Sequence, residues 1–374
     1  MHGALAERLA GDATISFAAF VELALYDPVD GFYAGGGRAG RRGDFLTSPE
    51  VGPLFGALIA RALDAEWERV GRPDPFVVVD AGAGPGTLAR TVRVAEPGCG
   101  PSLSYLLVER SAAQRAHHGE HLPGWEGERA GDDLLAAVST PTRGRGPVFA
   151  SSATMPERLG SGVVVANELL DNLPFDVVRP SGGGAERMAV AWRDGRVEAV
   201  VEPAPHDVAE ALGTLGVPPG AWVPWQATAR AWVARALGAV GAGRLVVVDY
   251  GAPTPDLAAR SAMSWLRTYR GHERGGHPLD APGSQDITSD VALDQLQLDR
   301  PATRVRTQAE WLHDLGIDEL VEEGRRRWAA AAHAPDLAAI RARSRVREAE
   351  ALTEPEGLGG FTVLEWEVGA RRDR

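Results

Sequence analysis

Short apolar runs alternate with longer stretches of helical periodicity along most of this chain. Runs rich in Val and Leu and bounded by Gly or polar residues predict strands that are buried on both faces, as in a parallel sheet. Five such runs stand out: Phe76–Asp80, Ser102–Glu109, Val163–Ala166, Leu245–Asp249 and Phe361–Val368. Because helical segments separate them, the pattern predicts an α/β fold with a mainly parallel sheet.

The segments between these strands predict additional elements. The pattern of 1–72 is helical at both ends, around a Gly-rich loop. Met188–Val201 reads as a hairpin with Asp194-Gly195 at its turn. We expect helices in 210–237, interrupted by the sequence PPGAWVPW, a long polar loop after Gly251, and helix from Gln308 to about Glu350. The predicted organisation is a helical N-terminal cap (1–72), a first part of the core (73–175), an insertion of hairpin and helices (176–240), and a second part of the core with a substrate-covering loop and a helical insertion (241–374).

A glycine-rich loop directly follows the first predicted strand. Gly82, Gly84 and Gly86 let the backbone turn tightly and approach a ligand closely. The free N–H groups at the start of the next helix would face that ligand. The spacing GxGxG after Asp80 is the pattern of Rossmann-like methyltransferases, which use an acid near the methionine amino group of S-adenosylmethionine (SAM). Gly84, Gly86 and Ala89 also satisfy the GxGxxA form of dinucleotide folds, so the loop by itself leaves NAD open.

Acidic residues further along the chain fit an adenosine ligand. Glu109 ends the second predicted strand, where a carboxylate can accept both ribose hydroxyls. Such an acid favours an unphosphorylated ribose and so disfavours NADP. Asp132 follows a short run after Trp125, at a position where this class often contacts adenine.

Two further segments carry candidate chemistry. The strand 163–166 continues into Asn167, Glu168 and Asp171, and ligands in doubly wound sheets lie outside the carboxyl ends of strands. Carboxylates there can hold a guanidinium or ammonium in line with a methyl donor. The segment RGDFLTSPEVGPLFG places Asp44 and Thr47 in one short turn before an apolar helix, which is either a helix cap or a lid over the cofactor.

Composition narrows the function classes. The 374 residues contain no lysine, which excludes a P-loop lysine and any Schiff-base lysine. Cys99 is the only cysteine, so the chain has no intrachain disulfide. The net charge of −12 argues against nucleic-acid binding through a broad basic surface. We find no long apolar segment and no secretory h-region, and expect a cytoplasmic protein without membrane insertion.

Several of these segments together resemble the MidA family of SAM-dependent methyltransferases. The most specific matches are GDFLTSPE, NELLDNLP and the pair TYRGHE and PGSQDIT, and the resemblance runs from about Ile15 to Trp366. The family loop commonly starts with Glu, where this chain has the shorter Asp80. Mitochondrial members of the family are protein arginine methyltransferases that assist the assembly of respiratory complex I.

The resemblance implies a Rossmann-like class I methyltransferase core with helical elements that cover the active site. It implies SAM contacts from Gly82, Gly84, Gly86 and Glu109 and places Asn167 and Glu168 at the active centre. We expect direct methyl transfer without a metal, to a protein or peptide whose arginine Glu168 and Asp171 would bind. Further candidates for the acceptor site are Asp44, Thr47, His272 and Asp286. The alternatives are an assembly factor that binds SAM without catalysis, a small-molecule methyltransferase, and an NAD-dependent oxidoreductase.

Overall fold

The computed structural model describes residues 14–34, 47–193, 196–270, 273–334 and 336–369. These residues form two compact units. The sheet unit comprises the described residues of 46–168, 235–249 and 302–374, and the insertion unit those of 1–45, 169–234 and 250–301. Helix α9 (Ala227–Ala239) contains one of the boundaries. The four-part division expected from the sequence stays a prediction.

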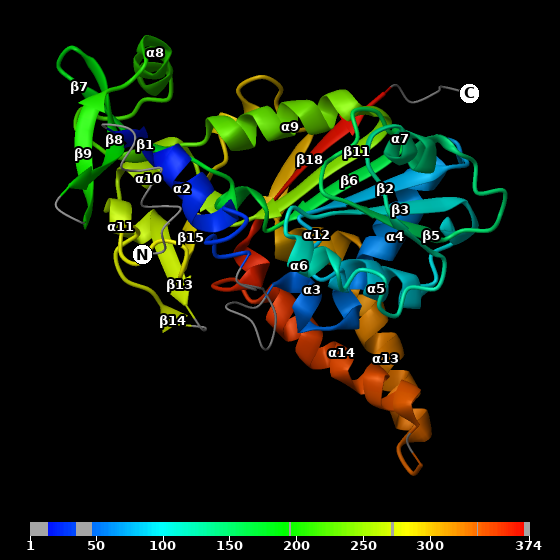
Figure 1. Ribbon diagram of the computed structural model, residues 1–374. Helices are drawn as coiled ribbons and strands as arrows, with labels where there is room; N and C mark the ends of the chain where they lie inside the picture. The colour runs from blue at the N-terminus through cyan, green and yellow to red at the C-terminus, as the bar shows by residue number, and fades with distance from the viewer. Residues whose placement is uncertain (1–13, 35–46, 194–195, 271–272, 335, 370–374) are drawn as a thin grey trace. The chain divides into compact units, whose positions relative to one another are not determined.

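An eight-stranded sheet is the centre of the sheet unit (Figure 1). Its order is β17-β18-β11-β6-β2-β3-β5-β4, and all neighbours are parallel except β18, which runs antiparallel to both β11 and β17. The strands are β2 (Phe76–Ala81), β3 (Leu103–Val108), β4 (Trp125–Glu128), β5 (Val148–Ser152), β6 (Gly160–Asn167), β11 (Val240–Asp249), β17 (Arg304–Thr307) and β18 (Thr362–Val368).

Helices cover both faces of this sheet (Figure 1). One face carries α4 (Pro53–Arg69), α5 (Thr87–Ala95) and α12 (Gln308–Asp314), and the other α7 (Gly131–Ser139). The apolar runs of the central strands need this cover, since β2 and β3 are buried along their whole length. Phe55 of α4, Leu88 of α5 and Trp311 of α12 join Val78 and Val163 of the strands in one hydrophobic core.

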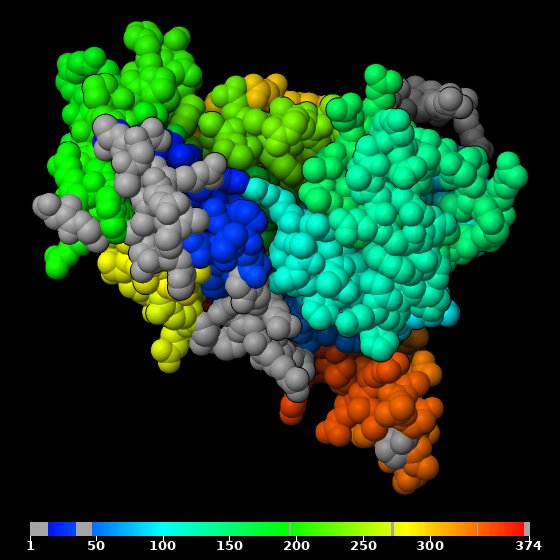
Figure 2. Space-filling view, viewed as in Figure 1, coloured from blue at the N-terminus to red at the C-terminus, as the bar shows by residue number. Residues whose placement is uncertain are grey.

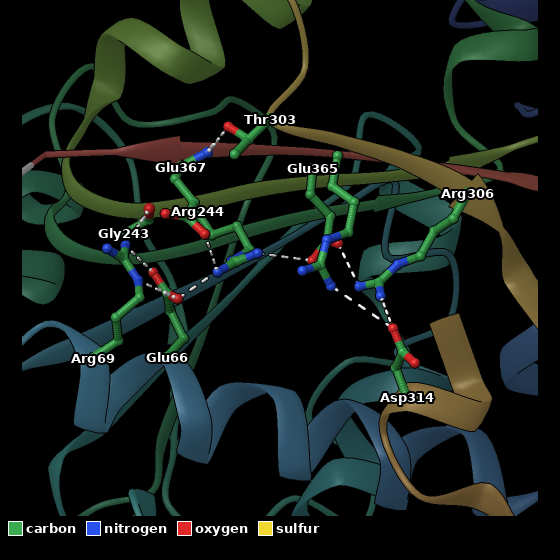
Figure 3. Close-up of polar contacts among 10 residues, drawn as sticks. Glu66, Arg69, Gly243, Arg244, Thr303, Arg306, Asp314, Glu365 and Glu367 are labelled. Atoms are coloured by element: carbon green, nitrogen blue, oxygen red, sulfur yellow. Dashed lines mark hydrogen bonds and ion pairs between the residues drawn. The ribbon is translucent and has the colours of Figure 1, made fainter. Parts of the chain in front are cut away.

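An ionic network fixes α4 to the antiparallel edge of the sheet (Figure 3). Arg244 of β11 binds Glu66 of α4 at 3.3 Å and Glu365 of β18 at 3.0 Å. Arg69 and Arg306 extend the network by binding Glu66 and Glu365, each at 2.5 Å. Since buried carboxylates are tolerated only when they are paired, these arginines account for the two buried glutamates.

Two packed helices extend from the sheet unit, and we call them the helical arm. They are α13 (Ile317–Ala331) and α14 (Leu337–Thr353). Both are drawn in orange to red in Figure 1, and the space-filling view shows the far end of the arm standing clear of the sheet and its covering helices (Figure 2). None of the helices in the described ranges combines the length and the apolar character that a membrane crossing needs.

The insertion unit contains a second, antiparallel sheet. Its order is β1-β8-β7-β10, with β9 also paired to β8. Its strands are β1 (Ile15–Ser16), β7 (Asp176–Ser181), β8 (Gly184–Arg193), β9 (Arg196–Pro203) and β10 (Val223–Trp225). The helices α2 (Phe17–Tyr26) and α8 (His206–Thr214) also belong to this unit, and so does a three-stranded sheet of β13 (Leu266–Arg270), β14 (Glu273–Arg274) and β15 (Asp286–Ser289).

The predicted fold class is confirmed: all five predicted strands and the hairpin β8–β9 are present, while the turn at 194–195 lies outside the described residues. The interruption by PPGAWVPW contains a strand, β10, and the stretch from 308 to 350 forms three helices. The polar segment after Gly251 was wrongly expected to be a loop. It forms short elements, among them α10 (Thr254–Ala258) and α11 (Ala262–Trp265), because buried residues such as Trp265 and Ile287 hold it in a core.

Candidate functional site

The glycine-rich loop connects β2 to α5 in a conformation that requires glycine. Gly82, Gly84 and Gly86 all have positive φ, of 73°, 52° and 82°. A Cβ on Gly84 would meet no atom within 4 Å, whereas one on Gly86 would lie 2.9 Å from Leu107 Cδ2. The backbone at Gly84 therefore borders open space, and Gly86 packs against the sheet.

Glu109 lies directly after β3, beside this loop. Its Oε2 accepts a hydrogen bond from Gly84 N at 3.1 Å, and its Oε1 accepts one from Ser111 N at 2.8 Å. Burial raises the pKa of the Glu109 carboxyl, and the two backbone donors partly offset that rise. Glu109, which we expect to bind the ribose, thus also ties the glycine-rich loop to the end of β3.

His118, which was not predicted from the sequence, supports the glycine-rich loop through a hydrogen bond to the backbone of Gly84. His118 is fully buried, with Nε2 2.7 Å from Gly84 O and Nδ1 2.8 Å from Ser151 Oγ. A carbonyl only accepts, so Nε2 carries the proton and Nδ1 accepts from the Ser151 hydroxyl. Burial lowers the pKa of His118, which favours this neutral form. No local motif marks the residue, because its partners lie 34 and 33 positions away.

Asp80 is buried inside the sheet at the end of β2. Its Oδ2 accepts a hydrogen bond from the Tyr105 hydroxyl at 3.2 Å. Burial raises the pKa of Asp80 to about 7. An ammonium group nearby would favour the ionised form, so this environment is compatible with the predicted contact to the methionine amino group, which stays a prediction.

Asn167 ends β6, and Glu168 follows it directly, on the other side of the loop from Glu109. Glu168 has a φ of +52°, a strained value for a residue with a side chain. Its N–H donates to Val248 O at 2.8 Å, and its Oε1 accepts from Ser48 N at 3.2 Å and from Asn167 Nδ2 at 3.0 Å. The Oδ1 of Asn167 is buried and has no hydrogen-bond partner within the described ranges. An orphaned buried acceptor of this kind indicates a ligand group.

Strand register brings these groups together around the glycine loop. Ala81 of β2 pairs with Val108 of β3 on one side and with Ala166 of β6 on the other. The residues that follow these three are Gly82, Glu109 and Asn167. Glu109 and Asn167 therefore flank the start of the loop at the same edge of the sheet.

The insertion unit holds a separate cluster of buried polar side chains. The Tyr250 hydroxyl donates to Asp171 Oδ2 at 2.5 Å and lies 2.5 Å from Thr288 Oγ1, which must then donate to it. Burial raises the pKa of Asp171 to about 6. Asn172 Nδ2 donates to Asp286 Oδ1 at 3.0 Å. Of this cluster, the sequence predicted only Asp171 and Asp286.

Of the remaining predicted site residues, one is buried, one is exposed and two lie outside the described residues. Thr47 is buried at the N-terminal end of α3 (Ser48–Val51) but does not cap it with its side chain. Asp132 is exposed in the first turn of α7, after the edge strand β4, which β5 separates from β3. Its contact with adenine stays a prediction. Asp44 and His272 lie outside the described residues.

Comparisons with known proteins agree with this geometry. A family described as "Putative S-adenosyl-L-methionine-dependent methyltransferase" matches residues 58–308. A Danio rerio protein named "Protein arginine methyltransferase NDUFAF7, mitochondrial" is 26% identical over 339 residues, which cover 85% of this chain and 77% of the relative. A Drosophila melanogaster homolog of it is 41% identical over 95 residues, and there the chain spans only 22% of the relative's length.

A solved structure matches over almost the whole chain. It is a Burkholderia thailandensis protein bound to S-adenosyl-homocysteine, with a TM-score of 0.78 and 26% sequence identity. The match covers 97% of this chain and 92% of that protein. The ligand is the form of the methyl donor that remains after the methyl group has left.

Proposed function

The chain belongs to this family of S-adenosyl-L-methionine-dependent methyltransferases, and we propose that it transfers the methyl group to an arginine side chain of a protein. The membership confirms the resemblance found in the sequence, and the enzyme class and SAM as cofactor follow from it. NAD is thereby set aside. The arginine acceptor is the finer step, supported by the names of the relatives and by the chemistry of Glu168.

The residues around the glycine loop fit SAM. The open side of Gly84 allows close approach to the backbone, Glu109 offers a carboxylate for ribose hydroxyls, and the buried Oδ1 of Asn167 still needs a donor. When bound, SAM would supply a methyl group on a sulfonium, whose sulfur leaves as a neutral thioether when the methyl group is transferred. The protein then has to bind and orient the acceptor, and needs no covalent intermediate.

The fixed position of the Glu168 carboxylate is the observation that carries the proposal. Its carboxylate is fixed by Ser48 N and Asn167 Nδ2, on a backbone held in a strained conformation at the strand end. A fixed carboxylate binds a guanidinium through charge-assisted hydrogen bonds and directs one nitrogen toward the methyl group. The guanidinium must lose a proton as that nitrogen gains the methyl group, and Glu168 stabilises the charge until the proton leaves.

The location of the protein stays a prediction. The two relatives are named as a mitochondrial protein and its mitochondrial homolog, which does not support the cytoplasmic location expected from the sequence. These names describe where the relatives are found and do not establish the location of this chain. A protein acceptor is likewise part of the proposal.

The test uses Glu168→Gln, which keeps the size of the side chain and removes its charge. We expect unchanged SAM affinity by calorimetry and a fall in methyl transfer of about 100-fold or more, the size typical of lost charge stabilisation in an active site. Transfer is measured with labelled SAM and cell lysate, and the labelled residue is identified by mass spectrometry. The matched control is the exposed Glu157→Gln, expected to behave as wild type. Label on a small molecule or on another residue type would contradict the arginine proposal, and full activity of Glu168→Gln would remove Glu168 from it.

A further inference from the structure

The far part of the helical arm reverses the charge of the protein. Residues 324–347 contain seven arginines and one acid, Asp336, for a net charge of +6. The rest of the chain then has 32 arginines and 50 acids, a net charge of −18. This concentration of one sign on one element sets up a local positive potential.

Most of these arginines have no acidic partner. Within the described part of the chain, ion pairs engage only two of the seven: Arg325 with Glu322 at 3.8 Å and Arg345 with Glu323 at 3.0 Å. The other five are Arg326, Arg327, Arg341, Arg343 and Arg347, and all five are exposed. An arm built only for solubility would intersperse both signs of charge. Here the signs are separated, since the near part of α13 carries only acids and 324–347 carries almost only arginines.

The arm is anchored firmly at its base. Glu348 of α14 accepts a hydrogen bond from Leu54 N, at the start of α4, at 2.8 Å, and Ser344 Oγ donates to the same carboxylate at 2.5 Å. Arg345 Nη1 donates to Leu320 O at 2.9 Å, which ties α14 to α13. The arginines are therefore presented on a fixed scaffold, so that a partner need not order a flexible tail.

Apolar side chains lie beside the arginines. Leu337 is 74% exposed and Ile340 51% exposed, and at a spacing of three residues they share one face of α14. Trp328 of α13 is covered by Arg343, whose guanidinium carbon lies 4.7 Å from the ring centroid. Exposed leucine and isoleucine next to unpaired arginines form a mixed surface typical of protein recognition.

We propose that the helical arm is a docking site for another protein, through a segment of that partner rich in acidic and apolar residues. Charge complementarity defines the partner: acids meet the five unpaired arginines, and an apolar side chain covers Leu337 and Ile340. A membrane surface or a nucleic acid is extended and anionic, and would also approach the rest of the sheet unit, whose net charge outside 324–347 is −11. A segment of a protein needs to reach only the arm. This docking is independent of which residue the enzyme methylates.

The experiment measures binding of a synthetic helical peptide of Glu and Leu to the full chain, with a Gln-for-Glu version as the uncharged probe. The triple variant R327E/R341E/R347E reverses exposed, unpaired arginines and leaves the Arg343–Trp328 stack in place. We expect it to bind the acidic peptide at least about tenfold more weakly than wild type, and we expect wild-type binding to weaken as salt is raised. L337S/I340S should lose several-fold affinity without changing the salt dependence.

The matched control is R158E/R193E/R235E, which makes the same change in net charge at exposed sites outside the arm. It should bind the acidic peptide as wild type does, and circular dichroism should report the same fold for all variants. Equal losses in the arm and control variants would overturn the proposal, as would equal binding of the Gln peptide. Tighter arm-dependent binding to phosphatidylglycerol vesicles or to duplex DNA would also overturn it, in favour of that ligand.

Discussion

Glu109 and Asp171 are carboxylates held in opposite ways by the two units. In the sheet unit, Glu109 accepts hydrogen bonds from the backbone of Gly84 and Ser111, both within 25 positions of it. In the insertion unit, Asp171 is bonded by the side chain of Tyr250, 79 positions away. The first site is made of backbone groups and a local turn, and the second of side chains from distant segments.

This difference has physical consequences. A site made of backbone N–H groups depends on the path of the chain, so glycine at the right positions is its main requirement. A site made of buried side chains depends on each hydroxyl and carboxyl, because removal of one leaves its partner unsatisfied. Mutations should therefore affect cofactor binding in the sheet unit and mainly stability in the insertion unit. The predictions that follow test this contrast, ordered by the expected change in SAM affinity.

Gly84→Val should abolish SAM binding. The residue has a φ of +52°, which a β-branched side chain adopts only with strain, and its Cβ would enter the open space where we place the cofactor. Calorimetry should show an affinity at least about 1,000-fold weaker than wild type, a loss of about 4 kcal/mol. The control is Gly182→Val, at an exposed glycine whose Cβ also meets no neighbour. SAM binding retained by a folded Gly84→Val would mean that the cofactor lies elsewhere.

Glu109→Ala should weaken SAM by about 10- to 150-fold, since a hydrogen bond that involves a charged group contributes about 1.5–3 kcal/mol. The fold should persist, because these hydrogen bonds of the carboxylate go to the loop and to the turn after β3. Calorimetric titration with SAM measures the loss, and Glu126→Ala at an exposed position of the same unit is the control. Unchanged affinity in Glu109→Ala would exclude a ribose contact.

The sheet unit was largely predictable because its signals are local. Apolar runs located β2, β3, β6, β11 and β18, and glycine spacing located the cofactor loop. The strand β5 escaped prediction since its sequence, VFASS, has only two large apolar residues and follows a polar stretch. The helical pattern from 308 onward did not reveal the break at Gly316, whose φ of +83° ends one helix and starts the next.

The insertion-unit cluster could not have been derived in full. Asp171 was found from its position after a predicted strand and Asp286 alongside the family motifs, but Tyr250, Asn172 and Thr288 are common residue types in apolar strands and turns. Only the folded chain shows that they meet. His118 was missed for the same reason, since nothing in the polar segment 115–121 distinguishes it from its neighbours His117 and His121.

The pH dependence of SAM binding tests the place of Asp80. Its pKa of about 7 lies well above the ordinary value of 3.8, so the free protein holds a proton there below pH 7. A cofactor ammonium beside Asp80 favours the ionised form, so binding releases that proton and affinity rises with pH. Between about pH 5.5 and 7, where an α-amino group stays charged, the rise should be about tenfold.

Calorimetry in buffers of different ionisation enthalpy measures this proton release directly. Asp80→Asn, which cannot ionise, should bind SAM with a flat pH profile over the same range. A flat profile for the wild type would place the ammonium away from Asp80, even if Gly84 and Glu109 behave as predicted.

Tyr250→Phe should leave SAM affinity within about twofold of wild type and lower the free energy of unfolding, because it removes one hydroxyl from the Asp171 cluster. The folded pKa of Asp171, about 6, lies above the ordinary 3.8, so its protonation stabilises the fold and stability falls as pH rises from about 4 to 6. The Tyr250 hydrogen bond lowers that pKa, so the variant raises it and extends the loss to higher pH.

Urea unfolding should therefore show a loss of about 1.5–3 kcal/mol at pH 8, where the bond is to a carboxylate, and of about 0.5–1.5 kcal/mol at pH 5, where it is to a neutral acid. An equal loss at both values would mean that Asp171 does not titrate in this range. A large loss of SAM affinity in a folded Tyr250→Phe would break the contrast between the units, since the insertion-unit cluster would then determine cofactor binding as well. Retained affinity with a pH-dependent loss of stability would assign the two carboxylates their separate roles, Glu109 to the ligand and Asp171 to the fold.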